Sequence, residues 1–154
     1  MQTRTFTAAE ASALCAAAPA RIEYFCRTQL ITPAVEASRR GVSRRYSFEN
    51  LIEIAVAGEL QDAGIDVWMI HKALDELRKH WPKLRNERRR EGLAVLALLR
   101  SAADHVVAKA PSLMVQIGTT DLLTTAISVG YAIHVAIPVA WMIKQLEDTT
   151  GERL

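Results

Sequence analysis

Residues 19–51 read PARIEYFCRTQLITPAVEASRRGVSRRYSFENL, and this stretch decides the fold of the N-terminal half of the chain. A short helix begins at Pro19, an arginine-rich connection follows, and Ser47 begins a further helix. Between Arg21 and Arg45 there are six arginines against two acidic residues, a local balance of +4 on a chain whose net charge is +2. A local basic patch of this kind indicates a surface that binds a polyanion.

A further helix signal lies just upstream of this stretch. Thr7 followed by Glu10 has the spacing of a capping box, which predicts a short helix. Only three or four residues separate that helix from the next one, which is helix-turn-helix spacing. Pro33 stops the second helix, and residues 34–45, rich in arginine and containing a glycine, predict a hairpin or wing.

Two longer helices follow the hairpin. Ser47 caps the first of them, Asn50 is not expected to complete a capping box with it, and Gly64 ends it. Asp66 caps the second helix, and Pro82 closes it. Apolar residues recur every three or four positions along both helices, as in helices that bury one face. Residues 1–82 are therefore predicted to form one helical domain.

The rest of the chain follows a different pattern. Residues 83–103 predict one more helix, charged in its first half and apolar in its second, which would connect the domains or mediate dimerisation. Residues 104–154 predict a small α/β module for dimerisation or effector binding. Its expected elements are strands at 106–107, 112–117 and 131–137, a helix at 120–128 and a last helix after Pro138. The predicted fold class is thus mainly α: a winged helix-turn-helix domain, then a helix, then a small α/β module.

Composition excludes several classes of protein. Half of the residues are apolar and 23% are charged, which argues against disorder. Cys15 and Cys26 are too few for a disulfide framework, and no metal-binding spacing of cysteine or histidine occurs. No nucleophile–base pair or phosphate-binding glycine loop indicates an enzyme, and no cofactor is expected. The first ten residues lack the apolar region of a signal peptide, so a cytoplasmic protein is expected.

One apolar run raises the question of a membrane anchor. Leu122–Ile143 contains no Asp, Glu, Lys or Arg over 22 residues, a length that could span a bilayer. Gly130 and Pro138 interrupt the run, and its second half alternates like a strand. A buried α/β element is therefore the preferred interpretation, and a membrane-tethered regulator is the alternative.

Three tryptophans and one histidine have both a structural and a functional interpretation. Trp68, Trp81 and Trp141 are expected to be core residues, with the lining of an apolar effector pocket as the alternative. His134 lies in the strongest predicted strand. It is expected to be a hydrogen-bonded core histidine, with a ligand-binding or pH-sensing role as the alternative.

Five separate signals recur in the N-terminal half in a specific order. They are Tyr24-Phe25, RTQLITP at 27–33, RRYSFENL at 44–51, ELQDAGI at 59–65 and IHKAL at 70–74. In order and spacing, residues 5–80 resemble the DNA-binding domain of the MerR family of transcription regulators. Two positions depart from the family's motif. Gln29 replaces a glycine at a position suited to positive φ, and Glu23 stands where the family is often basic.

The resemblance implies a bacterial, sequence-specific, DNA-binding transcription regulator that acts as a homodimer on a pseudo-palindromic promoter site. The second helix would enter the major groove, and the wing would grip the DNA backbone. RNA polymerase or a small-molecule effector is a further expected partner. The alternative function is a protein-interaction adaptor or architectural DNA-binding protein whose apolar C-terminal module recruits a partner. The implied DNA-binding residues are Arg21, Tyr24, Arg27, Arg39, Arg40, Arg44, Arg45 and Tyr46.

Overall fold

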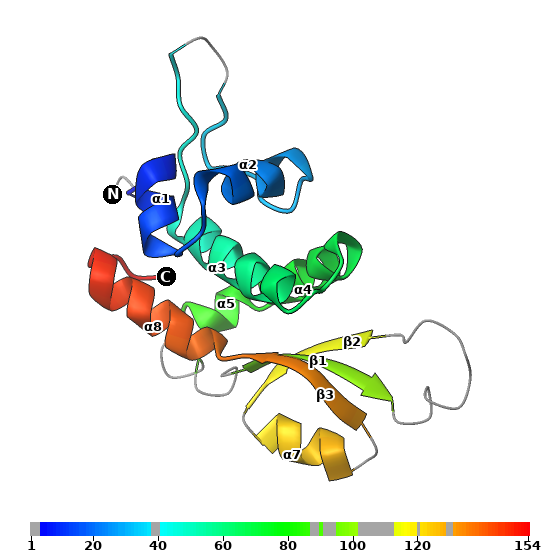
Figure 1. Ribbon diagram of the computed structural model, residues 1–154. Helices are drawn as coiled ribbons and strands as arrows, with labels where there is room; N and C mark the ends of the chain where they lie inside the picture. Colours follow the sequence, from blue (N-terminus) through cyan, green and yellow to red (C-terminus); the bar gives the residue numbers. More distant parts are fainter. Residues whose placement is uncertain are drawn as a thin grey trace. The chain divides into compact units, whose positions relative to one another are not determined.

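The computed structural model describes residues 4–37, 41–86, 90, 95–101, 113–119, 121–128 and 131–154 (Figure 1). The chain divides into two compact units, each described here by itself. Unit 1 is Met1–Val67 together with Met142–Leu154, and unit 2 is Trp68–Trp141. The fold is mainly α, as predicted, and unit 2 contains a small three-stranded antiparallel sheet.

Unit 1 contains α1 (Ala8–Leu14), α2 (Pro19–Arg27), α3 (Phe48–Asp62) and most of α8 (Val139–Thr150). The capping box predicted for α1 is confirmed. The Thr7 Oγ1 accepts from the Glu10 backbone N–H at 3.2 Å, and the Glu10 Oε2 accepts from the Thr7 backbone N–H at 2.7 Å. The two reciprocal bonds satisfy helix N–H groups that would otherwise lack a partner.

Each of the first three helices of unit 1 is followed, directly after its C-cap residue, by a residue with positive φ. These residues are Ala16 (φ 49°), Gln29 (φ 59°) and Gly64 (φ 77°). After α2, the Leu30 N–H donates to the Phe25 carbonyl at 2.9 Å and the Gln29 N–H donates to the Cys26 carbonyl at 3.1 Å. This pair of bonds is a Schellman motif, which favours glycine at the left-handed position. The positive φ expected at Gln29 is therefore confirmed.

One expectation about α3 is wrong. Asn50 does complete a capping box with Ser47: its Oδ1 accepts from the Ser47 N–H at 3.1 Å, and its N–H donates to the Ser47 Oγ at 3.2 Å. The sequence rule for this position asks for Glu or Gln, whose longer side chains reach back to the cap. The shorter Asn50 side chain reaches the same N–H here because it is buried beneath the connection from α2.

The core of unit 1 forms from apolar side chains spaced along the helices and the connection between them. Ile22 and Phe25 lie three residues apart on α2 and are fully buried, as a helix with one apolar face requires. Burial of each such side chain stabilises the fold by about 2 kcal/mol. Other fully buried core members are Phe6, Leu30, Ile31, Leu51, Ile54 and Leu60.

Helix α8 belongs to this unit through its contact with the start of the chain. The Arg4 Nη1 donates to the carbonyl of Thr150, the last residue of α8, at 3.1 Å. The Arg4 guanidinium also lies over the Phe6 ring, 4.9 Å from its centroid. A cation at a helix C-terminus satisfies a free carbonyl and complements the negative end of the helix dipole.

Unit 2 contains two helices followed by the sheet. The helices are α4 (Val67–Lys79) and the short α5 (Trp81–Leu84). The sheet contains β1 (Val95–Ser101), β2 (Leu113–Gly118) and β3 (Tyr131–Ile137). Helix α7 (Asp121–Ser128) connects β2 to β3 in the sequence. Both β2 and β3 pair with β1 in antiparallel fashion, in the order β2-β1-β3. Helix α7 packs on one face of the sheet, where Ala126 joins Ala97 and Leu99 in an apolar cluster.

The prediction of a helix at 83–103 is wrong for the second half of that range. Residues 95–101 form β1, the central strand, and the helix that contains residue 83 ends at Leu84. Consecutive residues Leu96, Ala97, Leu98 and Leu99 are all buried, so both faces of the strand are covered. Such a strand reads as a continuous apolar run, and periodicity alone does not distinguish it from a buried helix.

Four other elements predicted for the C-terminal module are confirmed. The strands expected at 112–117 and 131–137 are β2 and β3, and the helix expected at 120–128 is α7. The helix after Pro138 is α8. The strand predicted at 106–107 lies outside the described residues.

An irregularity in β3 changes the role expected for His134. The register shifts between Leu98 and Leu99, so that Leu98 lies opposite Val135 while Leu99 lies opposite Ile133. His134 is the extra residue of this β-bulge, and its side chain is exposed. The expectation of a core histidine is therefore wrong.

Two of the three tryptophans are also exposed, which contradicts the core interpretation. Trp68 is 61% exposed and Trp141 is 60% exposed. The Lys72 Nζ lies 3.7 Å from the centre of the Trp68 ring, which covers the aromatic face with a cation. The core interpretation is therefore wrong for Trp68 and Trp141, while Trp81 is half-buried.

The apolar run at 122–143 is divided among α7, β3 and the start of α8. Within the described ranges of the chain, no helix combines the length and the apolar character needed to cross a membrane.

Candidate nucleic-acid interface

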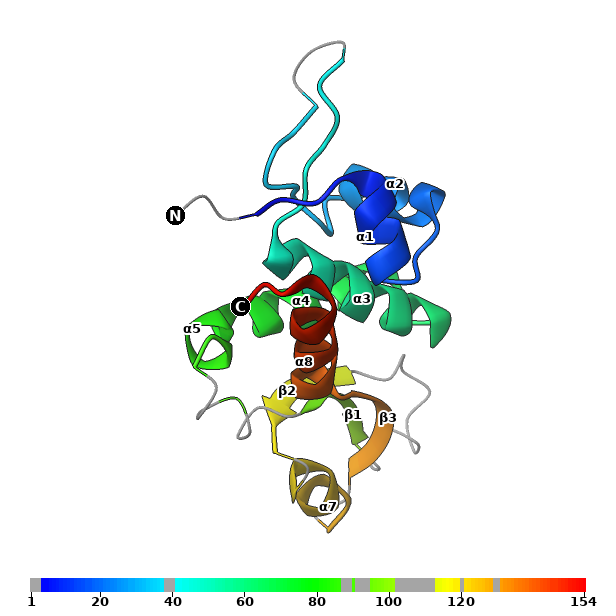
Figure 2. The ribbon, with the colours of Figure 1, turned by 90° about the vertical axis from the view of Figure 1, so that its left-hand side faces the viewer.

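A hairpin-like connection joins α2 to α3, and we call residues 34–46 the α2–α3 hairpin. Its arms pair through Val35 and Arg45, which exchange two backbone hydrogen bonds of 3.0 Å. At its root, Phe6 and Tyr46 exchange two more of 2.8 Å. In both ribbon views the arms leave the helices side by side (Figures 1 and 2). The hairpin predicted from sequence is therefore present, and Arg39 and Arg40 lie outside the described residues.

Asn50 clamps both ends of this hairpin to α3. Its Oδ1 accepts from the backbone N–H of Ala34 on the outgoing side and of Ser47 on the returning side, both at 3.1 Å. Its Nδ2 donates to the Thr32 carbonyl at 3.1 Å and to the Glu53 Oε2 at 3.2 Å. The side chain is buried and makes the full set of bonds that an amide allows. The root of the hairpin is thus fixed to α3.

Arg44 links the hairpin to α2. Its Nη1 is hydrogen-bonded to the Glu23 Oε2, and its Nε lies 3.2 Å from the Glu36 Oε2. Glu23 belongs to α2, and Glu36 belongs to the outgoing arm of the hairpin. Hydrogen bonding to Glu36, with attraction from both carboxylates, raises the pKa of Arg44. Glu23 therefore has a definite partner.

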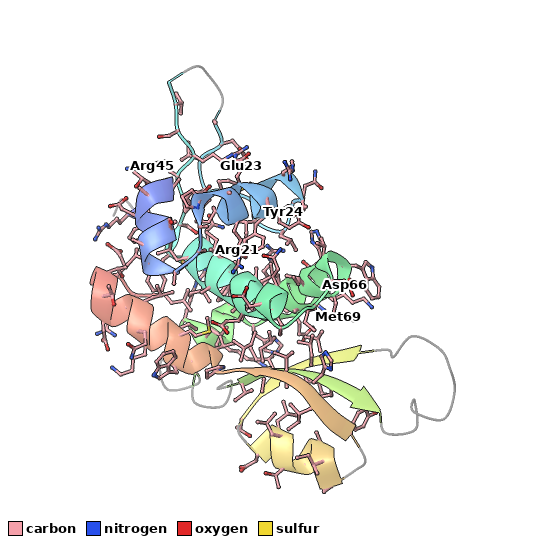
Figure 3. All side chains as sticks on the ribbon, in the orientation of Figure 1. Arg21, Glu23, Tyr24, Arg45, Asp66 and Met69 are labelled. Carbon is pink, nitrogen blue, oxygen red and sulfur yellow. The ribbon has the colours of Figure 1, made fainter. Side chains whose placement is uncertain are left out.

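Arg21 joins α2 to α3. Its Nη1 and Nη2 lie 3.1 and 2.7 Å from the two carboxylate oxygens of Asp62. The hydrogen bonds between them raise the pKa of Arg21 and lower the pKa of Asp62. Figure 3 shows Arg21, Glu23 and Tyr24 on the same short helix, with Arg21 directed toward α3 and Glu23 toward the hairpin.

Tyr24 and Arg27 lie together on the exposed side of α2. The Arg27 guanidinium carbon is 5.8 Å from the centre of the Tyr24 ring, and that ring packs at a tilt of 56° against Phe25. The Arg27 side chain is exposed and forms no ion pair with any other residue whose position the structure describes. Its guanidinium donors are therefore available for phosphate oxygens or guanine edges.

Tyr46 does not fit the role that the sequence suggested. It is 2% exposed, and its hydroxyl oxygen lies 3.6 Å from the Cys26 Sγ. Burial raises the pKa of this phenol. A hydroxyl in the core of unit 1 cannot reach a DNA phosphate, so the assignment of Tyr46 as a DNA contact is wrong.

Arg45 lies beside Tyr46 but is only partly buried. Its Nε donates to the Thr5 Oγ1 at 3.3 Å, which joins the hairpin to the segment before α1. The remaining guanidinium nitrogens form no ion pair with the part of the chain that the structure describes, so phosphate binding at Arg45 is compatible with this geometry.

Sequence reasoning missed the partners that organise this surface. Asp62 lies 41 residues from Arg21, and no local rule relates the two positions. The pairing of Val35 with Arg45 places Glu36 beside Arg44, so a correct hairpin register would have predicted that contact. Asn50 was considered only at its capping-box position, where no full box was expected, and its bonds to the outgoing arm depend on the fold.

No family model matches the chain. Over 60 residues it is 33% identical to uncharacterised helix-turn-helix-type transcriptional regulators of Mycobacterium bovis and Mycobacterium tuberculosis. The match covers 38% of this chain and 27% of those proteins, so the similarity spans about a quarter of the length of the curated relatives. Together with the α1–α2 geometry, it supports a helix-turn-helix class of protein.

Proposed function

We propose that this protein is a MerR-like, sequence-specific, DNA-binding transcription regulator that acts in the cytoplasm. The observation that carries the proposal is the junction of α2 with the α2–α3 hairpin. Arg44 connects them, Asn50 anchors the hairpin root, and Arg27 is exposed on α2. A helix and a hairpin held together in this way present Arg27 and Arg45 to a duplex from two adjacent elements. The similarity to helix-turn-helix regulators supports the same function.

In this proposal α2 enters the major groove and the hairpin follows the DNA backbone. Arg27 and Tyr24 are the contacts from the helix, because both extend from its exposed side. Arg45, with Arg39 and Arg40, supplies phosphate contacts from the hairpin. Arg21 is already occupied by Asp62 and mainly holds α2 against α3.

The protein is further proposed to bind a pseudo-palindromic promoter site as a homodimer. One helix and one hairpin contact too few base pairs to select a site in a genome, and a two-fold pair doubles the contacts. Unit 2 would then supply the subunit contact or an effector site, and RNA polymerase would be a partner at the promoter.

A titration of the full-length protein with promoter fragments tests this function. Affinity is measured over a series of salt concentrations, and wild-type protein is expected to lose affinity linearly in log K against log salt. Arg27→Ala should reduce the magnitude of that slope by about 1, because one phosphate contact is lost. Lys144→Ala, on α8, removes the same charge from another element and should leave the slope unchanged. A wild-type slope near zero would contradict the proposal.

Exposed apolar side chains in unit 2 favour one alternative function, that of a protein-interaction adaptor. Trp68 on α4 and Ile127 on α7 are 61% and 60% exposed, which favours a role of unit 2 in recruiting a protein partner. Such an adaptor would bind its partner equally well with and without DNA, and Arg27→Ala would leave that binding unchanged.

A further inference from the structure

The α2–α3 hairpin and α2 meet at a cluster of three charged side chains. Arg44 on the returning arm faces Glu36 on the outgoing arm and Glu23 on α2. We infer that Arg44 is a positioning residue, which sets the angle between the hairpin and α2 and does not contact DNA. This inference rests on the proposed DNA-binding function.

Two carboxylates accept hydrogen bonds from the guanidinium of Arg44. Its Nη1 donates to Glu23 and its Nε donates to Glu36, so the donors are spread over two different elements. Arg44 is 28% exposed, whereas the two carboxylate side chains are 59% and 57% exposed. The cation therefore lies beneath its acidic partners, and solvent reaches the acids more readily than the arginine.

Charge at this cluster opposes phosphate binding. One guanidinium and two carboxylates sum to a local charge of 1 − 2 = −1. A phosphate that approached Arg44 would have to displace two charge-assisted hydrogen bonds and would be repelled by the exposed acids. Arg27 differs on both counts, since it stacks on the Tyr24 ring and is exposed.

The position of Arg44 explains why such a link is useful. The root of the hairpin is fixed to α3 by Asn50 and to the segment before α1 by Phe6. These contacts hold the root but act at one end of the arm. The link from Arg44 to Glu23 adds a lateral contact to α2 itself, so helix and hairpin keep one mutual angle. A fixed angle is what simultaneous contact with a groove and an adjacent backbone requires.

The test compares Arg44→Ala, Glu23→Gln/Glu36→Gln and Arg27→Ala in the full-length protein bound to the same promoter fragment across a salt series. Thermal melting first establishes that each variant is folded. Arg44→Ala should weaken binding about tenfold while leaving the salt slope unchanged, whereas Arg27→Ala should reduce the slope by about 1. The double glutamine variant should also weaken binding, although it removes two negative charges from a DNA-binding surface.

The opposite pattern would overturn the inference. A slope reduced by about 1 in Arg44→Ala would make Arg44 a phosphate ligand. Tighter binding by Glu23→Gln/Glu36→Gln would make the acids competitors of DNA, and unchanged affinity of Arg44→Ala would leave the link without a role. Each of these three results concerns a variant and leaves DNA binding by the wild-type protein intact. A wild-type slope near zero is a different result, and it would remove both the proposed function and this inference.

Discussion

Arg21 and Asp62 form a bidentate ion pair that joins α2 to the last residue of α3, with nitrogen–oxygen distances of 2.7 and 3.1 Å. Two parallel N–H···O bonds fix both the distance and the relative orientation of their side chains. The pair therefore orients α2, the helix proposed to read DNA, on the helix beneath it. Arg21, which the sequence predicted as a DNA contact, thus has a structural partner within the protein.

Substitution at this pair should lower thermal stability in a salt-dependent way. Arg21→Ala and Asp62→Asn should each lower Tm at low ionic strength, and the difference from wild type should shrink in 1 M salt, because exposed ion pairs are screened. Differential scanning calorimetry at both salt concentrations measures this. Arg27→Ala removes an arginine from the same helix without breaking an ion pair among the described residues, and its Tm should match wild type at both.

Loss of the Asn50 side chain should be more costly. Asn50→Ala removes four hydrogen bonds and leaves buried backbone groups unpaired, which should reduce the free energy of unfolding by about 3 kcal/mol. Ser47→Ala, which removes the helix cap alone, should cost about 1 kcal/mol. Urea denaturation followed by circular dichroism compares them. Equal costs for the two variants would show that Asn50 acts only as a cap.

Glycine at position 29 should stabilise the protein. Gln29 has a φ of 59° and an exposed side chain, so Gln29→Gly relieves left-handed strain and should increase the free energy of unfolding by about 0.5–1 kcal/mol. Ala20→Gly, inside α2, should have the opposite effect and cost up to about 1 kcal/mol. Denaturant midpoints give both values, and destabilisation by both glycines would contradict the expectation.

Stability should fall at alkaline pH because of Cys15. Burial raises the pKa of this thiol from 9.0 to about 12, and its Sγ lies 3.2 Å from the Leu51 carbonyl. Below pH 9 the thiol is protonated in both the folded and the unfolded chain, so it adds no pH dependence. Between pH 9 and 12 the unfolded chain loses the proton and the folded chain keeps it, which lowers the free energy of unfolding by about 1.4 kcal/mol per pH unit.

Cys15→Ala isolates this effect from the titration of other groups. The variant lacks the hydrogen bond to Leu51 and should be less stable than wild type at neutral pH. The stability gap between the two proteins should narrow as pH rises above 9, and urea midpoints at pH 7.5, 9, 10 and 11 measure it. Parallel curves over this range would contradict the raised pKa.

Removal of the Tyr46 hydroxyl should leave DNA binding intact. Tyr46→Phe keeps the buried ring and deletes only the contact with the Cys26 thiol, so affinity should stay within about twofold of wild type. Arg27→Ala, measured on the same fragment, is the comparison that should lose affinity. A marked loss in Tyr46→Phe would indicate that the hydroxyl becomes exposed on DNA.

The elements predicted correctly from sequence are those with local causes. The capping residues Thr7 and Ser47 and the hairpin before Ser47 all follow from neighbouring residues, whereas the positive φ at Gln29 was implied by the resemblance to the MerR motif. Local chemistry fails where tertiary burial decides the outcome. The run VLALLRS is a strand because both its faces are covered, and a window of sequence contains no information about that covering.

In the candidate site, too, local sequence predicts some features and tertiary contacts decide others. Its arginines were found because clustered charge is visible in sequence, but their availability depends on partners far along the chain. Arg21 is occupied by Asp62, Arg44 is occupied by Glu23 and Glu36, and Tyr46 is buried. Composition gives the number of arginines but does not show which of them are already paired with a carboxylate.

The bond from Arg4 to the Thr150 carbonyl spans 146 residues of sequence, and it bears on when this protein can fold. Unit 1 draws residues from both ends of the described chain, so it cannot be completed on the ribosome until α8 has been synthesised. Chains usually acquire structure from the N-terminus onward during synthesis. Here Arg4 lacks its Thr150 partner throughout translation of unit 2, so the unit that begins first in the sequence is completed only after the other has been synthesised.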